Sequence, residues 1–233
     1  LTPEGQLNPD IQPESGWNYE IGSRGRLLNQ RLFYDIALYS MQIRNLLVAR
    51  RTAEDAFVGI NAGKTNHNGL ELALSYTLYD RGEGSNIQLF TNYTYADYRF
   101  EEFVDGDRDF SGNDLTGVPR HSLSAGIDGQ SKPGFYGNLN FQWISQIPIL
   151  DDNSRFSEAY ALTNLKVGYR QVLARRFHLD AFVGIQNLWD EAYASMLQIN
   201  AVGFNAPPRY YYPGLPRNYF GGISLKYAFS IKK

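Results

Sequence analysis

Residues 135–147 read FYGNLNFQWISQI, and their side chains alternate between apolar and polar with a period of two. The apolar positions are Phe135, Gly137, Leu139, Phe141, Trp143 and Ile147. The polar positions between them are Asn138, Asn140, Gln142 and Gln146. Successive side chains of a strand point to opposite faces, whereas a helix repeats every 3.6 residues. This stretch therefore predicts a strand with one apolar face and one polar face.

The same alternation recurs along the chain and predicts an all-β protein. It is clearest at residues 70–78, 177–186 and 219–229. In full, the pattern predicts nine strands near 17–28, 31–50, 57–79, 86–100, 117–129, 134–147, 158–170, 177–189 and 217–229. The predicted connections are short at 28–31, 51–56, 80–85, 129–132 and 171–176, and long at 101–116, 148–157 and 190–216.

The length of these strands separates two kinds of β protein. A soluble β-sandwich or lipocalin-like barrel also alternates, but soluble strands average five or six residues and these run past ten. The polar face also carries large hydrogen-bonding groups on successive strands, among them Asn138, Lys166 and Asp180. Long strands with short turns at one end and long loops at the other are typical of outer-membrane barrels. We therefore interpret the chain as antiparallel transmembrane β-barrel strands with short periplasmic turns and long extracellular loops.

Composition excludes several other classes of function. The chain has 233 residues with 17 Tyr, 14 Phe and 3 Trp, no Cys, and a net charge of −2. The lack of Cys excludes Cys-ligated metal sites and thiol nucleophiles, and the balanced charge gives no reason to expect nucleic acid as a partner. Three widely spaced histidines, His67, His121 and His178, and the lack of a G-x-S-x-G motif give no catalytic constellation. We predict no enzyme activity, no cofactor and no metal site.

The strand count poses a problem of closure. Nine strands in an up-and-down order leave the first and last strands parallel, and single-chain bacterial barrels have even strand numbers. We therefore expect this sequence to form one part of a larger barrel.

Several motifs indicate which larger barrel this is. Residues 8–22 read NPDIQPESGWNYEIG, which resembles the "NPxLxPExSxxYExG" stretch of TonB-dependent outer-membrane receptors. Further matches follow in the order of that family: ALY at 37–39 with Ile43 and Asn45, NAGK at 61–64 with GLEL at 69–72, GVPRH at 117–121, NLWDEAY at 187–193 and PGLPRNYFGG at 213–222. Each motif alone is weak, but six in order cover essentially the whole chain.

The resemblance implies a fold, a location and a function. It implies a 22-stranded barrel in the outer membrane of a Gram-negative bacterium, in which residues 1–233 are the C-terminal part and an N-terminal plug and earlier strands precede them. The implied function is a receptor that binds a scarce nutrient, most often an iron–siderophore complex, and imports it into the periplasm by TonB-coupled active transport. Cobalamin, other metals, glycans and peptides stay open as ligands. The implied partners are membrane lipid, the plug and remaining strands, the TonB complex through the N-terminal part, and a metal-chelate ligand. The alternative is a small autonomous barrel that serves as an adhesin or a passive pore.

The long loop at 190–216 is the predicted substrate site. The candidate residues are Asn205, Arg209, Tyr210, Tyr211 and Tyr212, and the run of three tyrosines is set between Pro207-Pro208 and Pro213-Gly214. Tyr rings and an Arg at the mouth of a barrel can stack on and pair with an anionic aromatic chelate. The alternative reading of the tyrosines is an aromatic girdle at the rim and the start of the last strand.

An acidic run at 105–114 reads DGDRDFSGND and opens like a calcium loop. However, the sixth position is Phe110, where a calcium loop has Gly, and the twelfth is Thr116, where it has Glu. We predict a solvated extracellular loop without a specific metal site.

Overall fold

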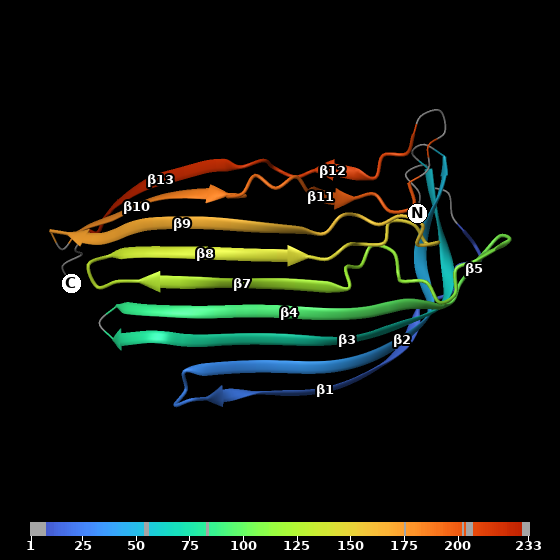
Figure 1. The fold of residues 1–233 in the computed structure, drawn as a ribbon, viewed down its shortest axis with the longest axis horizontal. Helices are drawn as coiled ribbons and strands as arrows, with labels where there is room; N and C mark the ends of the chain where they lie inside the picture. Colours follow the sequence, from blue (N-terminus) through green and yellow to red (C-terminus); the bar gives the residue numbers. More distant parts are fainter. Residues whose placement is uncertain are drawn as a thin grey trace.

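The computed structural model describes residues 8–53, 56–82, 84–174, 176–201, 203 and 207–229. Its main body is one antiparallel sheet in which nine strands lie in chain order (Figure 1). These strands are β1 (Ser15–Leu27), β2 (Leu32–Ala53), β3 (Ala56–Gly82), β4 (Ser85–Glu102), β7 (His121–Gln130), β8 (Phe135–Ile144), β9 (Tyr160–Leu173), β10 (Phe177–Gln186) and β13 (Asn218–Tyr227). Within the described residues, no helix is long and apolar enough to cross a membrane.

The nine predicted long strands are confirmed, with corrected ends. The strand expected from 117 begins at His121 because Gly117 has a φ of 85° and Pro119 follows it. The strand expected to reach 147 ends at Ile144, shortly before Pro148. Four short strands lie in the predicted long loops: β5 (Val104–Asp105), β6 (Arg108–Asp109), β11 (Ala194–Leu197) and β12 (Tyr211–Pro213).

The register places the predicted polar and apolar residues on opposite faces of the sheet. On the polar face, Asp128 lies opposite Asn138 and Arg170 lies opposite Asp180. Arg170 donates to Asp180 from Nε and Nη2, and the Tyr136 hydroxyl donates to the same carboxylate at 2.7 Å. On the other face, large apolar side chains stand exposed, among them Ile21, Leu38, Phe141, Val167, Val183, Ile223 and Leu225.

Aromatic rings form two bands at the two ends of this apolar face. Near the short turns, Phe135 packs on Tyr169 and Phe177 packs on Tyr227, with ring centroids 4.9 and 5.0 Å apart. Near the long loops, His121 stacks on Trp143. Positions 135 and 143 lie eight residues apart on β8, which at about 3.4 Å per residue is roughly 27 Å along the strand. With a tilt of about 40°, this spacing corresponds to roughly 20 Å of height, close to the apolar band of about 25 Å in outer-membrane barrels.

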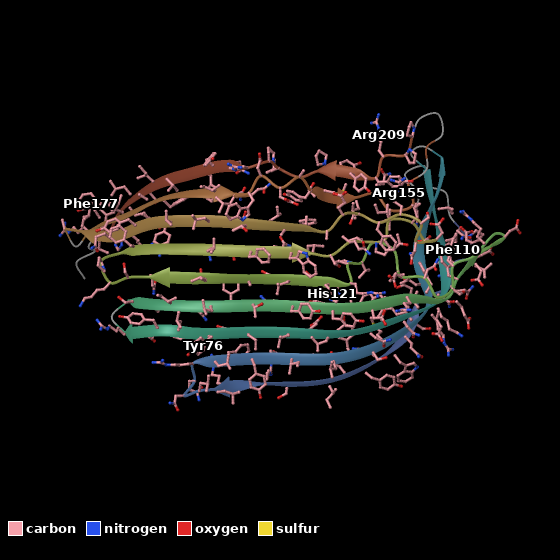
Figure 2. The ribbon with its side chains drawn as sticks, viewed as in Figure 1. Tyr76, Phe110, His121, Arg155, Phe177 and Arg209 are labelled. Carbon is pink, nitrogen blue, oxygen red and sulfur yellow. The ribbon has the colours of Figure 1, made fainter. Side chains whose placement is uncertain are left out.

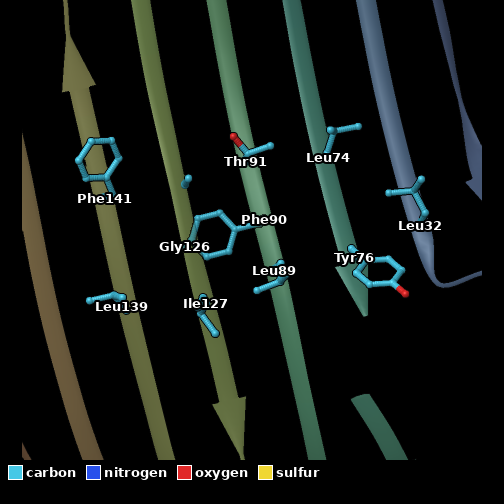
Figure 3. Close-up of a pocket in the computed structure, with 11 residues that line it drawn as sticks. Leu32, Leu74, Tyr76, Leu89, Phe90, Thr91, Gly126, Ile127, Leu139 and Phe141 are labelled. Carbon is cyan, nitrogen blue, oxygen red and sulfur yellow. The ribbon is translucent and has the colours of Figure 1, made fainter. Parts of the chain in front are cut away.

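Glycines on the polar face lie beneath aromatic rings of the neighbouring strand. In Figure 3, the Phe90 ring of β4 lies against Gly126 of β7, which is its direct register partner. A Cβ on this glycine would overlap the ring. The same arrangement joins Tyr39 to Gly69, Tyr136 to Gly168, Phe220 to Gly184 and Phe182 to Gly222. These contacts tie four pairs of neighbouring strands together.

The β2–β3 hairpin is longer than its neighbours and bends near its upper part. Asn45 has a φ of 59°, and the regular pairing of β2 with β3 skips Asn45 and Gly63. A Cβ on Gly63 would lie 2.5 Å from the Glu102 carbonyl oxygen of β4, so the backbone of β3 approaches β4 closely here. Beyond this point the hairpin turns away from the strand direction and runs across the loop end of the sheet (Figure 1).

Two sequence motifs meet at this bend. The Asn61 amide donates to the carbonyl oxygens of Gln12 and Asn45 at 3.0 and 2.6 Å, and its side-chain oxygen accepts from the Gln12 backbone. The Glu14 carboxylate accepts from the Leu47 amide at 2.6 Å. The NPDIQPE segment and the NAGK segment therefore hold the bent hairpin through side chain to backbone hydrogen bonds.

Candidate functional site at the loop end of the sheet

Three long connections meet at the end of the sheet opposite the short turns (Figure 1). They span residues 103–120, 145–159 and 187–217. The Figure 2 view places Phe110, Arg155 and Arg209 at this end and Phe177 at the other.

The NLWDE motif closes the base of the 187–217 loop. Asn187 directly follows β10 in a left-handed conformation, with a φ of 52°, and its Nδ2 donates to the carbonyl oxygens of Glu191 and Leu215 at 2.9 and 3.1 Å. The Asp190 carboxylate accepts from the Arg217 amide at 2.7 Å. Asn187 and Asp190 therefore form this turn, and both ends of the loop are fixed to each other.

The tyrosine run lies in a hairpin within this loop. Tyr211–Pro213 form β12, which pairs with β11, so these residues are not the start of the last strand. Tyr210 lies beneath the Arg155 guanidinium, whose carbon is 5.0 Å from the Tyr210 ring centroid. The centroids of the Tyr210 and Tyr211 rings are 6.2 Å apart. Arg209 is exposed, and Tyr211 and Tyr212 are exposed by 46% and 49%. Asn205 lies outside the described residues.

The three loops line a half-open cavity of about 800 Å³. Its walls include Gly117 of the first loop, Ile147 and Glu158 of the second, and Tyr193 and Tyr211 of the third. The Tyr160 and Tyr193 rings pack against each other in this wall, with centroids 5.1 Å apart. Of the five predicted site residues, Tyr211 lines the cavity. Its apolar and aromatic walls, with a few polar groups, are typical of small-molecule sites.

Sequence reasoning missed Tyr160 and Tyr193 as members of the site. Tyr193 belongs to the NLWDEAY motif, but its ring lies against Gly214 and Tyr160, which are distant in sequence. Tyr160 is the first residue of β9 and has the same parity as Asn164 and Lys166, so it is on the polar face. The motif was the available signal for Tyr193, and the strand alternation was the signal for Tyr160.

We predicted a solvated loop for the acidic run at 105–114, but in the structure part of this run is packed against the protein. β5 and β6 form a small hairpin, and Phe103 and Phe110 anchor it in a cluster with Phe100 and Leu115. The Ser111 hydroxyl and amide hydrogen-bond the Asp109 carboxylate and hold its pKa below the ordinary value. Among the described residues, no group of three or more His, Cys, Asp or Glu side chains is arranged to hold a metal ion.

Two histidines use their rings in contacts within the protein. His67 is buried and its Nε2 lies 2.9 Å from the Thr65 hydroxyl. The His121 Nδ1 lies 2.8 Å from the Tyr93 hydroxyl in the aromatic band near the loops. His67 is on the polar face of β3, where it is enclosed, whereas His121 is on the apolar face.

A second depression, of about 450 Å³, lies away from the loops (Figure 3). Its lining is dominated by apolar-face side chains, including Leu32, Leu74, Leu89, Ile127, Leu139 and Phe141. It therefore belongs to the apolar face and is separate from the tyrosine-lined cavity.

Long antiparallel strands, an apolar face between two aromatic bands and a loop cavity at one end define the wall of a transmembrane β-barrel. The family described as TonB dependent receptor-like, beta-barrel, matches residues 2–188, and the chain belongs to this family.

Similar proteins are named as siderophore receptors. The chain is 28% identical over 222 residues to the ferric-pyoverdine M114 receptor PbuA of Pseudomonas sp. strain M114, which covers 90% of this chain and 25% of that receptor. It is 23% identical over 214 residues to the catecholate siderophore receptor Fiu of Escherichia coli K12, with the same coverage. The chain thus spans about a quarter of the length of these relatives.

Solved structures share the fold. The ferric-catecholate import receptor Fiu from E. coli K12, in its closed form, has a TM-score of 0.67 at 19% identity and covers 95% of this chain and 29% of that one. The ferric citrate transporter FecA, in its unliganded form, has a TM-score of 0.69 at 21% identity and covers 91% and 31%.

Proposed function

We propose that this chain is the C-terminal part of the barrel of a TonB-dependent receptor in the outer membrane of a Gram-negative bacterium. The strand order ends at β1 and β13, so each of these strands has one edge without a neighbour within the described sheet. Backbone groups in lipid require hydrogen-bond partners, so a membrane-embedded sheet of this kind needs further strands to close it. The chain also spans only about a quarter of its curated relatives.

The proposed activity is binding of a ferric siderophore at the extracellular mouth and its import by TonB-coupled transport. The carrying observation is the cavity between the three long loops, with Tyr160, Tyr193 and Tyr211 in its walls. Aromatic walls suit the flat ring systems of an iron chelate, and the Arg155 guanidinium over Tyr210 adds positive charge nearby. The chemistry is binding and gating: a plug domain in the complete receptor blocks the lumen until the TonB complex moves it.

The test is iron uptake by cells that depend on this receptor. A strain that lacks its gene is complemented with the intact receptor, and uptake of radioactive iron is measured from a ferric pyoverdine and from a ferric tris-catecholate. We expect uptake of one of them that stops when the proton gradient is dissipated. Uptake that is equal with and without the gene, for both chelates, would refute the proposal.

The matched pair Tyr211→Ala and Tyr212→Ala tests whether the cavity is the binding site. The two tyrosines are neighbours with similar exposure, but Tyr211 lines the cavity. We expect roughly a tenfold loss of chelate affinity for Tyr211→Ala, about the value of one aromatic stacking contact. Equal affinities of the two variants would place the site elsewhere.

The proposal that the chain is part of a longer polypeptide has its own test. An antibody to residues 190–216 identifies the protein in native outer membranes, and its intact mass is measured. From the coverage of the relatives, we expect about three to four times the 26.5 kDa of this chain. A mass of 26.5 kDa would favour a small autonomous barrel.

A further inference from the structure

A tight turn at residues 150–153 lies between the two other long loops. The Asn153 amide donates to the Leu150 carbonyl oxygen at 2.9 Å, and Asn153 has a φ of 52°, a conformation that Asn tolerates better than most residues. The turn therefore has a defined shape that presents the side chains of Asp151 and Asn153 to its neighbours.

On one side, the turn is bonded to the 103–120 loop. The Thr116 hydroxyl donates to Asp151 Oδ1, and the Asn113 side-chain Nδ2 donates to the Asp151 backbone carbonyl oxygen at 2.8 Å. Asn153 exchanges two hydrogen bonds with the Asp114 backbone, since its side-chain oxygen accepts from the amide at 2.7 Å and its Nδ2 donates to the carbonyl at 3.0 Å.

On the other side, the turn is bonded to the 187–217 loop. Asn200 Nδ2 donates to Asp151 Oδ2 at 3.0 Å, and the Asp151 amide donates to Asn200 Oδ1 at 3.1 Å. The Asn200 amide donates to the Ile149 carbonyl oxygen at 2.9 Å. Ile149 and Ala201 are both buried, so the surroundings of these bonds are partly closed to water.

The bonded residues adjoin the walls of the tyrosine-lined cavity. Gly117, which follows Thr116, and Ile199, which precedes Asn200, both line it. The Gly117 amide also donates to the Pro148 carbonyl oxygen at 2.9 Å, next to the lining residue Ile147. A relative movement of any two loops at Asp151 therefore changes the shape of the cavity.

We propose that Asp151 is a positioning residue that fixes the three loops in the arrangement that forms the binding cavity. Its expected effect on ligand binding rests on the proposed function. A carboxylate is suited to the position because its two oxygens accept from two different loops at once, Oδ1 from Thr116 and Oδ2 from Asn200. An Asn at this position retains one acceptor oxygen and presents an NH₂ group to the other donor.

The test uses the intact receptor that contains this sequence, purified in detergent without ligand. Hydrogen exchange is measured by mass spectrometry for Asp151→Ala, Asp151→Asn and Asp152→Ala. Asp152 is the matched control because its carboxylate accepts hydrogen bonds from the backbone amide and the hydroxyl of Ser154, two residues along the same loop. For Asp151→Ala we expect roughly ten- to hundredfold faster exchange in 113–117 and 198–201, the effect of losing hydrogen bonds to a charged group. The exchange rate of Asp151→Asn is expected to lie between the rates of Asp151→Ala and of the unmodified receptor.

If Asp151→Ala does not fold, Asn200→Ala serves as the second variant. It is expected to accelerate hydrogen exchange in residues 149–151. Exchange in Asp151→Ala that equals exchange in Asp152→Ala would overturn the positioning role. The second readout is affinity for a ferric pyoverdine and a ferric tris-catecholate. Faster hydrogen exchange in the loops with unchanged affinity for the chelates would show that Asp151 does not position the binding cavity. Loose loops in a receptor that binds neither chelate even when unmodified would support the positioning of the loops and contradict the proposed function.

Discussion

Replacing Phe103 by Ala is expected to loosen the 103–118 loop and leave the barrel strands intact. Phe103 is exposed by 2% and its ring lies 4.8 Å from the Phe100 ring and 5.5 Å from the Phe110 ring. The cluster also contacts Leu46 of the bent hairpin, so it joins the loop to β2. All of these residues lie beyond the aromatic band near the loops, outside the apolar face.

The magnitude follows from the burial of the ring. Phe to Ala changes in protein cores cost about 3–5 kcal/mol, and a small cluster at a loop end relaxes more easily than a large core, so we take about 3 kcal/mol. Since about 1.4 kcal/mol is a factor of ten, the equilibrium constant for local opening of the loop should rise by roughly a hundredfold. The Phe110 amide, which donates to the Phe103 carbonyl oxygen at 2.8 Å, and the Gly112 amide, which donates to Phe100, should lose protection together.

The assay is limited trypsin digestion at Arg108 of the intact receptor in outer-membrane vesicles, followed by hydrogen exchange at these two amides. Val104→Ala is the control, because Val104 is the next residue and is exposed by 65%. The folded barrel is monitored by its altered mobility on gels before heating. Equal cleavage rates for Phe103→Ala and Val104→Ala would refute the reasoning, because a buried anchor and an exposed neighbour would then contribute alike.

Three further predictions follow from the two faces of the sheet and from the 150–154 turn. Gly168→Val is expected to lower the yield of folded receptor, measured by gel mobility, because its side chain would overlap the Tyr136 ring. Ile223→Arg, on the apolar face where residue 223 is exposed by 81%, should reduce membrane insertion at a cost of about 2–4 kcal/mol, whereas Ser224→Arg on the polar face should insert normally. Hydrogen bonds from the Ser154 side chain and amide hold the pKa of Asp152 below its ordinary value, so this turn is stabilised at neutral pH and the stabilisation is lost as the pH falls below about 4 and through the lowered pKa. Exchange of the Ser154 amide, corrected for its intrinsic rate, should therefore accelerate below that pH, and a pH-independent corrected rate would contradict this.

Much of the fold could be predicted because its signals are local. Alternation is a property of adjacent residues, so each long strand was visible in its own sequence, and turn formers such as Asn187 and Asp190 act on their own backbone. The strand ends were less predictable where tertiary contacts intervene, as at Gly117, whose amide bonds to Pro148 of another loop.

The candidate site was less predictable because it is made by contacts between distant segments. Asn200 and Asp151 are 49 residues apart in the chain, and no pattern in either loop announces their pairing. The short strands β5 and β11 have too few residues to show alternation. Phe103 and Phe110 stand in a charged run, and their burial depends on Leu46, which is contributed by another hairpin.

The aromatic rings that cover glycines also bear on how the sheet assembles. Tyr136 lies directly opposite Gly168, and a slip of β9 by two residues would set its ring against the side chain of Lys166 or Arg170 instead. A slip of β9 by one residue would turn Gly168 toward the membrane side and set Val167 or Tyr169 against the ring instead. Because such pairs recur on four strand pairs, a misaligned neighbour meets a steric penalty at a specific point along its length. Each pair therefore favours a single register between its two strands.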